Sequence, residues 1–175
     1  MNTTKDFRFE FQTPVPVAKY MVDMIPFNGS CKSALEPTPG MGTIVEKLLD
    51  ADFFVHAPTN FFDIEMSAKY DCIVMNPPFS LKYAFGVPNN VTETGMRLGY
   101  YILTECMKMS DYVIALMPWF TISDSDVRLR FLKEYGIKSL TALPRKTFQY
   151  ARIQTVVIEL KKDYTGETIF KTFNF

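Results

Sequence analysis

The sequence is poor in the residues from which disulfide scaffolds and metal sites are built. Its 175 residues contain one histidine and three cysteines. The positions of Cys31, Cys72 and Cys106 fit neither a disulfide framework, which needs paired cysteines, nor the closely spaced ligand pairs of a zinc site. We therefore expect small buried thiols in a reducing compartment, a cytoplasmic location and no metal ion.

Long hydrophobic runs are absent as well. No apolar stretch approaches the roughly 20 residues that cross a bilayer, and the first ten residues lack the apolar core of a signal peptide. Hydrophobic residues nevertheless make up 47% of the chain, and aromatic residues 15%. This supply suits one compact core and leaves no room for a second full domain. We predict a single soluble domain over residues 1–175 that does not enter a membrane.

The chain also has no net charge, because 19 basic residues balance 19 acidic ones. Binding of nucleic acid through charge attraction alone is therefore disfavoured. The charges are unevenly placed: residues 1–80 hold six Lys or Arg against ten Asp or Glu, and residues 81–175 hold thirteen against nine. If the protein contacts a polyanion, the second half should face it, although an ordinary scatter of solvated charges gives the same counts.

The sequence does contain an alternation of short apolar runs and helical stretches, without repeats or linkers. The spacing of apolar residues and the positions of capping and breaker residues predict the elements. The predicted helices span residues 13–25, 43–49, 99–108 and 126–135. The predicted strands span residues 33–35, 53–56, 70–75, 112–117, 138–143 and 155–161, the last with the alternation expected near a sheet edge. This order favours a doubly wound α/β sheet.

A glycine-containing loop, EPTPGMG at residues 36–42, follows the first predicted strand. Gly40 and Gly42 allow the backbone to approach a ligand, and the next helix begins with free amide donors. A tight strand-to-helix turn needs glycine for its own geometry too, but ligands of open α/β sheets bind at this end of the strands. No Lys-Ser or Lys-Thr follows the glycines, and the Glu36 carboxylate would repel phosphate. We therefore expect a ligand with an ammonium group.

The tetrapeptide Asn76-Pro77-Pro78-Phe79 directly follows the apolar strand predicted at residues 70–75. It places an amide, a rigid backbone carbonyl and an aromatic ring together at a strand end. A stiff strand exit that ends in a core phenylalanine would explain an arbitrary peptide of this kind. The apolar strand before it and the glycine loop upstream favour a functional site instead.

The chemistry that this tetrapeptide suits is transfer to a conjugated amine. An exocyclic amine on an aromatic base is a poor nucleophile because its lone pair is delocalised into the ring. The Asn76 side-chain oxygen and the Pro77 carbonyl could accept hydrogen bonds from its two N–H groups and free the lone pair. The prolines would pre-organise these acceptors, and Phe79 would stack on the base, a contact worth about 1–3 kcal/mol.

Together these segments resemble the N6-adenine DNA methyltransferases, in the order where the cofactor motifs precede the catalytic one. In that family a helix opens with Thr-Pro, as at Thr13-Pro14, before a Glu-Pro-x-x-Gly-x-Gly loop and an Asn-Pro-Pro-(Tyr/Phe) motif. The likeness continues to a segment in which a phenylalanine lies beside the flipped base, and Phe148 is the matching position. The resemblance thus covers nearly the whole chain.

The resemblance implies a Rossmann-like class I methyltransferase sheet that binds S-adenosylmethionine and methylates adenine in DNA, in a restriction-modification setting. Residues 76–79 take the catalytic role, and Phe148 contacts the target base. Arg145, Lys146 and Arg152 flank Phe148 and suit phosphate contacts, or else belong to a solvated loop. The implied cofactor contacts are made by Thr13, Pro14, Glu36, Pro37, Gly40, Gly42, Asn60 and Phe61.

The sequence departs from the family in its cofactor-binding half. The family's second strand ends in an acidic residue that binds the cofactor ribose, but only 33 residues separate Gly42 from Asn76, and that strand has no evident counterpart. The end of the family's third strand is matched near Asn60, where the family usually has aspartate. This shortened half leaves a degenerate, non-catalytic subunit that binds nucleic acid as an alternative.

We also expect no separate target-recognition domain within residues 1–175. The segment between Phe79 and Gly99 is short, which is compatible with low specificity, with a separate specificity subunit, or with a substrate other than duplex DNA. RNA bases remain an alternative. So does a protein glutamine, because release-factor glutamine methyltransferases share the Asn-Pro-Pro motif, but the chain lacks their helical domain. Adenine in DNA is therefore the first expectation.

Overall fold

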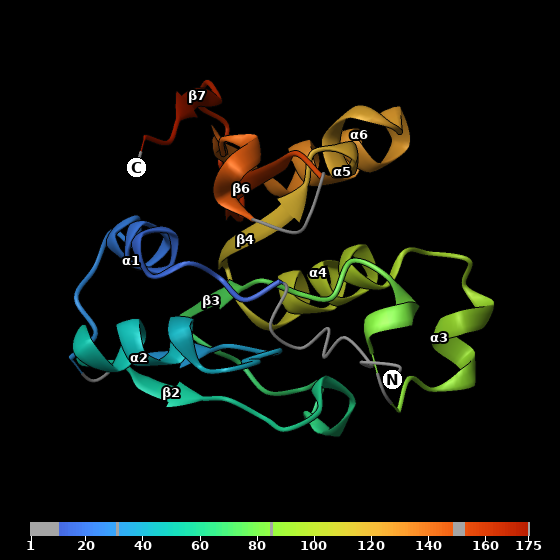
Figure 1. Ribbon diagram of the computed structural model, residues 1–175, viewed down its shortest axis with the longest axis horizontal. Coiled ribbons are helices and arrows are strands. Elements are labelled where there is room, and N and C mark those ends of the chain that lie inside the picture. Colours follow the sequence, from blue (N-terminus) through green and yellow to red (C-terminus); the bar gives the residue numbers. More distant parts are fainter. Residues whose placement is uncertain (1–10, 31, 85, 149–152, 175) are drawn as a thin grey trace, which may run out of the picture.

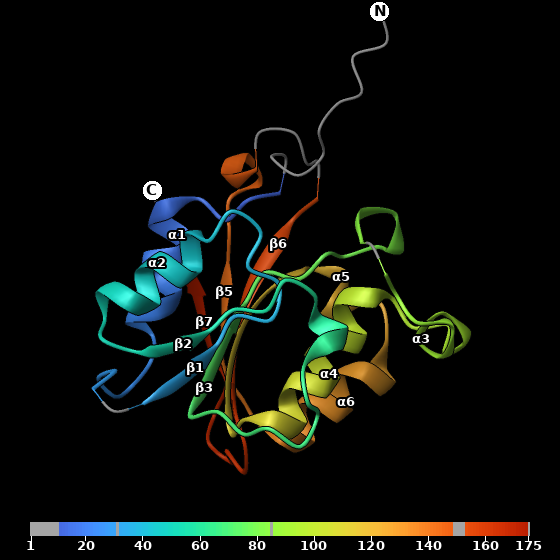
Figure 2. The same ribbon diagram turned by 90° about the horizontal axis from the view of Figure 1, so that it is seen from below.

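A central β-sheet lies between two layers of helices (Figures 1 and 2). The computed structural model describes residues 11–30, 32–84, 86–148 and 153–174. The strands are β1 (Ser33–Leu35), β2 (Phe54–His56), β3 (Cys72–Met75), β4 (Tyr112–Pro118), β5 (Ile137–Ala142), β6 (Thr155–Lys161) and β7 (Ile169–Thr172). This arrangement confirms the predicted doubly wound α/β sheet.

The α-helices follow the predicted order with shifts of one or two residues at most ends. They are α1 (Val15–Asp23), α2 (Thr43–Asp50), α3 (Asn89–Glu93), α4 (Leu98–Met109), α5 (Phe120–Ser123) and α6 (Asp126–Tyr135). Short 3₁₀ turns are η2 (Phe61–Asp63), η3 (Leu81–Tyr83) and η4 (Arg145–Thr147). The sequence did not predict α3, α5 or the 3₁₀ turns, which are each five residues or shorter. None of the described helices is long and apolar enough to cross a bilayer.

The strands of the sheet lie in the order β2-β1-β3-β4-β6-β5-β7. The first four run parallel, β6 is antiparallel to both β4 and β5, and β7 pairs parallel with β5. The prediction that β6 lies near an edge is wrong, because six of its seven residues are buried between two neighbours. The acidic residue of this strand, Glu159, is buried and paired with Lys138. The edge itself is formed by β7, which was not predicted.

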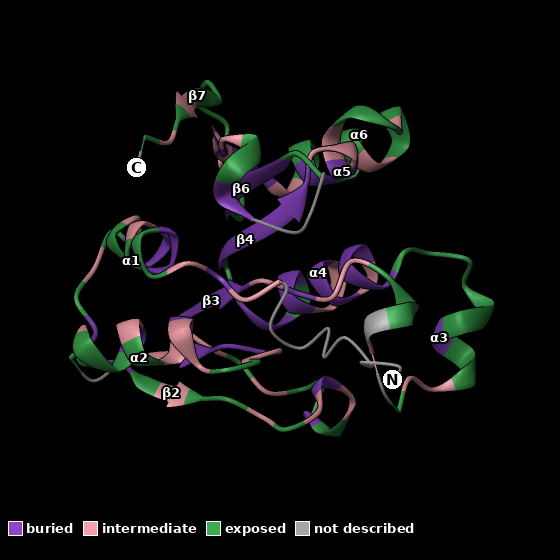
Figure 3. Ribbon diagram, viewed as in Figure 1, coloured by how far each residue is buried: buried purple, intermediate pink, exposed green. Residues whose placement is uncertain are grey.

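Each face of the sheet has its own hydrophobic core. Helices α1 and α2 cover one face, where Met21 and Leu48 pack against Val74 and Ile114. Helices α4 and α6 cover the other, and α3 lies farther out from the sheet (Figure 2). The central strands β3, β4 and β6 are buried along almost their whole length (Figure 3). The loops that leave the carboxyl ends of β1 and β3 are therefore held between two packed layers.

The cofactor-binding half contains the strand predicted over residues 53–56, which lies beside β1. Strand β2 pairs in parallel with β1 along three residues and forms the sheet edge. It ends at the exposed His56 and leads within a few residues into η2. This half of the sheet therefore contains one strand where the family has two, and it is short, as expected. The place next to β1 is nevertheless occupied by a strand.

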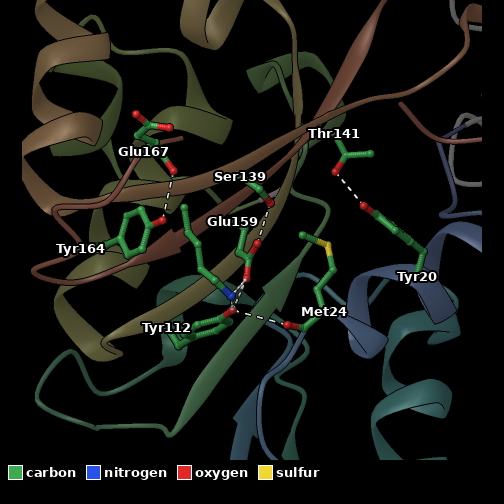
Figure 4. Close-up of polar contacts among 9 residues, drawn as sticks. Tyr20, Met24, Tyr112, Ser139, Thr141, Glu159, Tyr164 and Glu167 are labelled. Carbon is green, nitrogen blue, oxygen red and sulfur yellow. Dashed lines mark hydrogen bonds and ion pairs between the residues drawn. The ribbon is translucent and has the colours of Figure 1, made fainter. Parts of the chain in front are cut away.

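A buried polar network joins β4, β5 and β6 on the face covered by α1 (Figure 4). The Glu159 carboxylate is 2% exposed and accepts hydrogen bonds from Ser139 Oγ at 2.5 Å, from Lys138 Nζ at 2.6 Å and from the Tyr112 hydroxyl. Burial opposes ionisation of this carboxyl, but the three donors outweigh it, and the pKa of Glu159 lies below its ordinary value. The network is thus an ionised pair at the end of the sheet away from the two loops.

Candidate functional site

The two predicted loops meet at the carboxyl ends of β1 and β3. Because these strands are parallel neighbours, their following residues emerge side by side. The Thr38 hydroxyl of the first loop lies 3.4 Å from the Asn76 carbonyl oxygen of the second. Between them is a small cavity of about 40 Å³, here called the Asn76 cavity, which is lined by Phe11, Gln12, Thr13, Glu36, Thr38, Pro39, Gly40, Thr43, Ile44 and Asn76.

The glycine loop has the open backbone that a ligand site requires at Gly42. This residue has a φ of 85° and stands at the N-terminus of α2, and a Cβ placed there would meet nothing within 4 Å. Gly40 also has a positive φ of 54°, but a Cβ there would come within 2.7 Å of Gln12 Oε1. The same Gln12 oxygen accepts a hydrogen bond of 2.9 Å from Met41 N. Gly42 therefore faces open space, whereas Gly40 makes room for Gln12.

Among the described residues that line the cavity, Glu36 supplies the only carboxyl group. Its side chain is 1% exposed, and one oxygen accepts a hydrogen bond of 2.9 Å from Thr38 N. Burial raises the pKa of Glu36 to about 8, against a smaller opposing effect of the two Thr38 hydrogen bonds. A cation placed in the cavity would favour the ionised form. The group thus fits the ammonium ligand that the sequence predicted.

The Asn76 amide is oriented by the segment before α1. Its Nδ2 donates to the Phe11 carbonyl oxygen at 2.9 Å and to Thr13 Oγ1 at 3.0 Å, which uses both of its hydrogens. The amide oxygen Oδ1 consequently points away from these partners and keeps its acceptor capacity. Thr13 was predicted to contact the cofactor, and the structure shows a further task for its buried hydroxyl, which is to hold Asn76.

The rest of the Asn-Pro-Pro-Phe loop rests on the first turn of α4. Pro77 is buried, and Pro78 and Phe79 are half-buried. A Cβ at Gly99 would lie 3.2 Å from the Pro78 carbonyl oxygen and 3.4 Å from the Phe79 Cα. The absence of a side chain at Gly99 therefore lets the helix pack closely against the loop. Phe79 also lines a second, shallow hollow.

Several predicted site residues do not line the Asn76 cavity. The side chain of Asn60 caps η2 by accepting a hydrogen bond of 3.1 Å from Phe62 N. Phe61 is 3% exposed and belongs to the hydrophobic core. Pro14 caps α1, and Pro37 is buried behind the glycine loop.

The predicted nucleic-acid residues lie in and after η4. Phe148 is 7% exposed and packs in the core on the α1 and α2 face, so its ring does not border the hollow at Phe79. Arg145 and Lys146 are exposed on η4. Arg152 lies outside the described residues. Among the described residues, no three His, Cys, Asp or Glu side chains form a group that could hold a metal ion.

Three residues that position the site were not predicted. Gln12 accepts a hydrogen bond from the glycine loop, Thr38 joins Glu36 to the Asn76 backbone, and Gly99 packs against the loop of residues 76–79. Thr38 stands inside the glycine motif and could have been proposed as its polar residue. Gln12 and Gly99 act through contacts across the fold, which no local pattern indicates.

Comparison with known proteins gives the fold a name. No protein-family model and no curated protein matches the sequence. A methyltransferase subunit of a type I restriction-modification system from Streptococcus thermophilus matches with a TM-score of 0.70 and 18% identity, over 93% of this chain and 47% of that one. A protein proposed to be a class I S-adenosylmethionine-dependent methyltransferase from Listeria monocytogenes matches with a TM-score of 0.71 and 15% identity, over 94% and 66%. The chain has the class I methyltransferase fold.

The class I methyltransferase fold is shared with proteins described as acting on other substrates. A protein proposed to be an RNA methyltransferase from Pyrococcus horikoshii matches with a TM-score of 0.55 and 14% identity, over 93% of this chain and 92% of that one. The chain spans about half the length of the Streptococcus thermophilus subunit. At these identities the likeness confirms the expected methyltransferase fold and leaves the substrate to the chemistry of the site.

Proposed function

We propose that the protein is an S-adenosylmethionine-dependent methyltransferase that methylates the N6 amine of adenine in DNA. The observation that carries this proposal is the Asn76 amide, whose two hydrogens are held by Phe11 and Thr13. Its oxygen is left as an acceptor next to the Pro77 carbonyl, at the strand end where ligands of open α/β sheets bind. Two rigid acceptors match an amine that carries two N–H groups.

Residues 76–79 have different roles toward the target base and its amine. Asn76 Oδ1 and the Pro77 carbonyl accept its two hydrogens, which localises the lone pair on nitrogen as it becomes pyramidal. Phe79, half-buried at the loop end, stacks on the base. S-adenosylmethionine, when bound, supplies a methyl group on a cationic sulfur, and the nitrogen–carbon bond forms as the carbon–sulfur bond breaks. The methylated nitrogen then releases its extra proton to water, so no strong base is needed.

The residues of the Asn76 cavity fit the amino-acid end of that cofactor. The buried carboxyl of Glu36 takes its ammonium group. Gly42 is not one of the lining residues, but its open backbone leaves space for the bulk of the ligand. Thr13 and Thr38 complete a polar lining around Asn76. We assign cofactor contacts to Glu36 and Gly42 first, and we keep Thr13, Pro14, Pro37, Gly40, Asn60 and Phe61 as predictions.

DNA is proposed as the substrate because the fold likeness includes a subunit of a restriction-modification system. We propose a separate specificity subunit as a partner, and Arg145, Lys146, Phe148 and Arg152 remain the predicted contacts to nucleic acid. The second candidate is a subunit that binds nucleic acid without turnover. It is favoured by β2, which ends at His56 where the family has a ribose-binding carboxylate, and by Asn60, whose side-chain oxygen is engaged as a cap.

The test is methyl transfer from labelled S-adenosylmethionine to DNA and RNA oligonucleotides and to a glutamine peptide. The expected product is N6-methyladenine in DNA, identified by mass spectrometry, with micromolar or tighter cofactor binding in a calorimetric titration. Cofactor binding without transfer to adenine would overturn the adenine assignment. Absence of both binding and transfer would favour the non-catalytic subunit.

A further inference from the structure

The shallow hollow beside Phe79 combines positive charge with aromatic walls. We call it the Phe79 hollow; the residues that matter in its lining are Phe79, Arg97, Gly99, Tyr100, Thr121 and Arg128. The last residue of the Asn76-Pro77-Pro78-Phe79 loop lines this hollow, whereas the first residue lines the Asn76 cavity. A nucleotide whose base occupies the loop would have its backbone within reach of this hollow.

Two guanidinium groups border the hollow, and one of them has no acidic partner. Arg97 stacks on Phe120 at 3.9 Å and lies 3.9 Å from Asp124. Arg128 lies 5.6 Å from the Tyr100 ring centre, and among the described residues no carboxylate pairs with it. Stacking of this kind keeps a guanidinium flat and leaves its N–H fork directed outward. The pair thus forms a preformed site for an anion.

Neutral donors point to the same place. Helix α4 is 12 residues long, and no side chain caps its first turn, so the amides of Gly99 and Tyr100 have no hydrogen bond within the described residues. Thr121, which is 1% exposed, also lines the hollow and adds a hydroxyl group to it. The hollow therefore offers N–H, O–H and guanidinium donors without a competing carboxylate at Arg128.

We propose that the Phe79 hollow binds a phosphodiester of the nucleic-acid substrate that adjoins the methylated nucleotide. This inference rests on the proposed function and adds a substrate contact that the sequence did not suggest. Arginine forks and helix amides are suited to phosphate oxygens. Anchoring the backbone here holds the extruded base against Phe79 and toward Asn76. The predominance of basic residues in the second half of the chain agrees with this placement.

The test compares the variant Arg128→Gln with the matched control Arg130→Gln on the same helix. Arg130 is an exposed residue paired with Asp126. Binding of an adenine-containing single-stranded oligonucleotide is measured across a range of salt concentrations. Arg128→Gln should weaken binding about tenfold and reduce the slope of log K against log salt by about 0.7, the value for one phosphate contact on a single strand. The control should change neither quantity.

A second measurement separates a phosphate contact from a structural role. Oligonucleotides with one methylphosphonate next to the target adenine lack a single backbone charge. If Arg128 binds that phosphate, the parent protein should bind the modified oligonucleotide about tenfold more weakly than the unmodified one. The Arg128→Gln variant should bind the two oligonucleotides equally well. Thr121→Val, which keeps the shape and removes the hydroxyl, should weaken binding a few-fold.

Three results would overturn the inference. One is an unchanged affinity and salt slope in Arg128→Gln, and another is equal methylphosphonate effects in parent and variant. The third is binding of inorganic phosphate at the hollow without binding of any oligonucleotide. Cofactor titration and methyl transfer by the parent protein are measured separately, so a failure of the proposed function and a failure of this phosphate site give different patterns.

Discussion

At the residue scale, Glu36 and Asn76 line the same cavity but are prepared by opposite means. Asn76 is fixed by two hydrogen bonds from its amide nitrogen, so its geometry is ready before any ligand arrives. Glu36 is kept out of water, and burial raises its pKa to about 8. Its carboxyl is therefore largely protonated at neutral pH until a cation replaces the proton.

This coupling predicts how cofactor affinity depends on pH. Between pH 6 and 7 the cofactor amine stays protonated, whereas Glu36 must lose its proton to bind it. Affinity should therefore rise about tenfold per pH unit in this range, with release of about one proton. Calorimetry in buffers of different ionisation enthalpy measures both quantities. Glu36→Gln should remove the pH dependence and the proton release. A pH-independent affinity of the parent protein would show that no ligand cation meets Glu36.

At the element scale, the catalytic loop depends on the start of α4. A Cβ added at Gly99 would lie 3.2 Å from the Pro78 carbonyl oxygen. This distance is shorter than an ordinary van der Waals contact, so the loop must shift to accept a methyl group. Helix α4 itself gains from alanine, because glycine in a helix costs roughly 0.5–1 kcal/mol. Stability and activity are thus expected to respond in opposite directions.

Gly99→Ala should leave the protein folded and at least as stable, while it lowers the rate of methyl transfer roughly tenfold by displacing the acceptors of the loop. Lys108→Ala, at an exposed position of the same helix, is the control and should change the rate little. Thermal unfolding and single-turnover transfer are measured for both variants. A fully active Gly99→Ala protein would show that the geometry of the loop does not depend on the absence of a side chain at the start of α4.

The buried network of β4, β5 and β6 makes a prediction about acid stability. Because hydrogen bonds lower the pKa of Glu159, its ionised form stabilises the fold at pH values above the ordinary value of 4.5. That contribution is lost as the pH falls through the lowered pKa of the folded state. Glu159→Gln should reduce the free energy of unfolding by about 3 kcal/mol near neutral pH, since it leaves Lys138 without its partner.

The same variant should lose less stability than the parent when the pH falls from 5 to 3. Urea unfolding at several pH values gives both numbers. Asp126→Asn removes an exposed carboxylate that pairs with Arg130 and should have little effect, because exposed ion pairs contribute little. Parallel pH profiles for the parent and Glu159→Gln would show that folding does not lower the pKa of this carboxyl.

Elements with local signals were predictable, and contacts across the fold were not. Helix α6 spans the predicted residues because Ser125 caps its start and Gly136 follows its end. Strand β6 was predicted near an edge from its alternating residue pattern, although the Glu159 carboxylate in it is buried with partners on β4 and β5. Phe148 was predicted to lie beside the target base from the family resemblance, whereas its ring packs in the core.

At the scale of the whole molecule, two hollows flank one rigid loop at the carboxyl end of a sheet buried on both faces. The Asn76 cavity suits a cation, and the Phe79 hollow suits an anion. A methyl donor with an ammonium group and a polyanionic acceptor would therefore meet across Asn76-Pro77-Pro78-Phe79. This polarity follows from the placement of Glu36 and Arg128 rather than from the net charge of the chain, which is zero.

The most direct test of this account is the single-turnover rate of methyl transfer to adenine by Asn76→Ala. The lost acceptor matters mainly as the target nitrogen becomes pyramidal, so the rate should fall about 10²–10³-fold, by analogy with the loss of one pre-organised donor in other sites. The calorimetric affinity for S-adenosylmethionine should stay within a few-fold of the parent, and Asn90→Ala, at an exposed position on α3, should transfer at the parent rate. A rate for Asn76→Ala within a few-fold of the parent would contradict the central claim that this amide activates the amine.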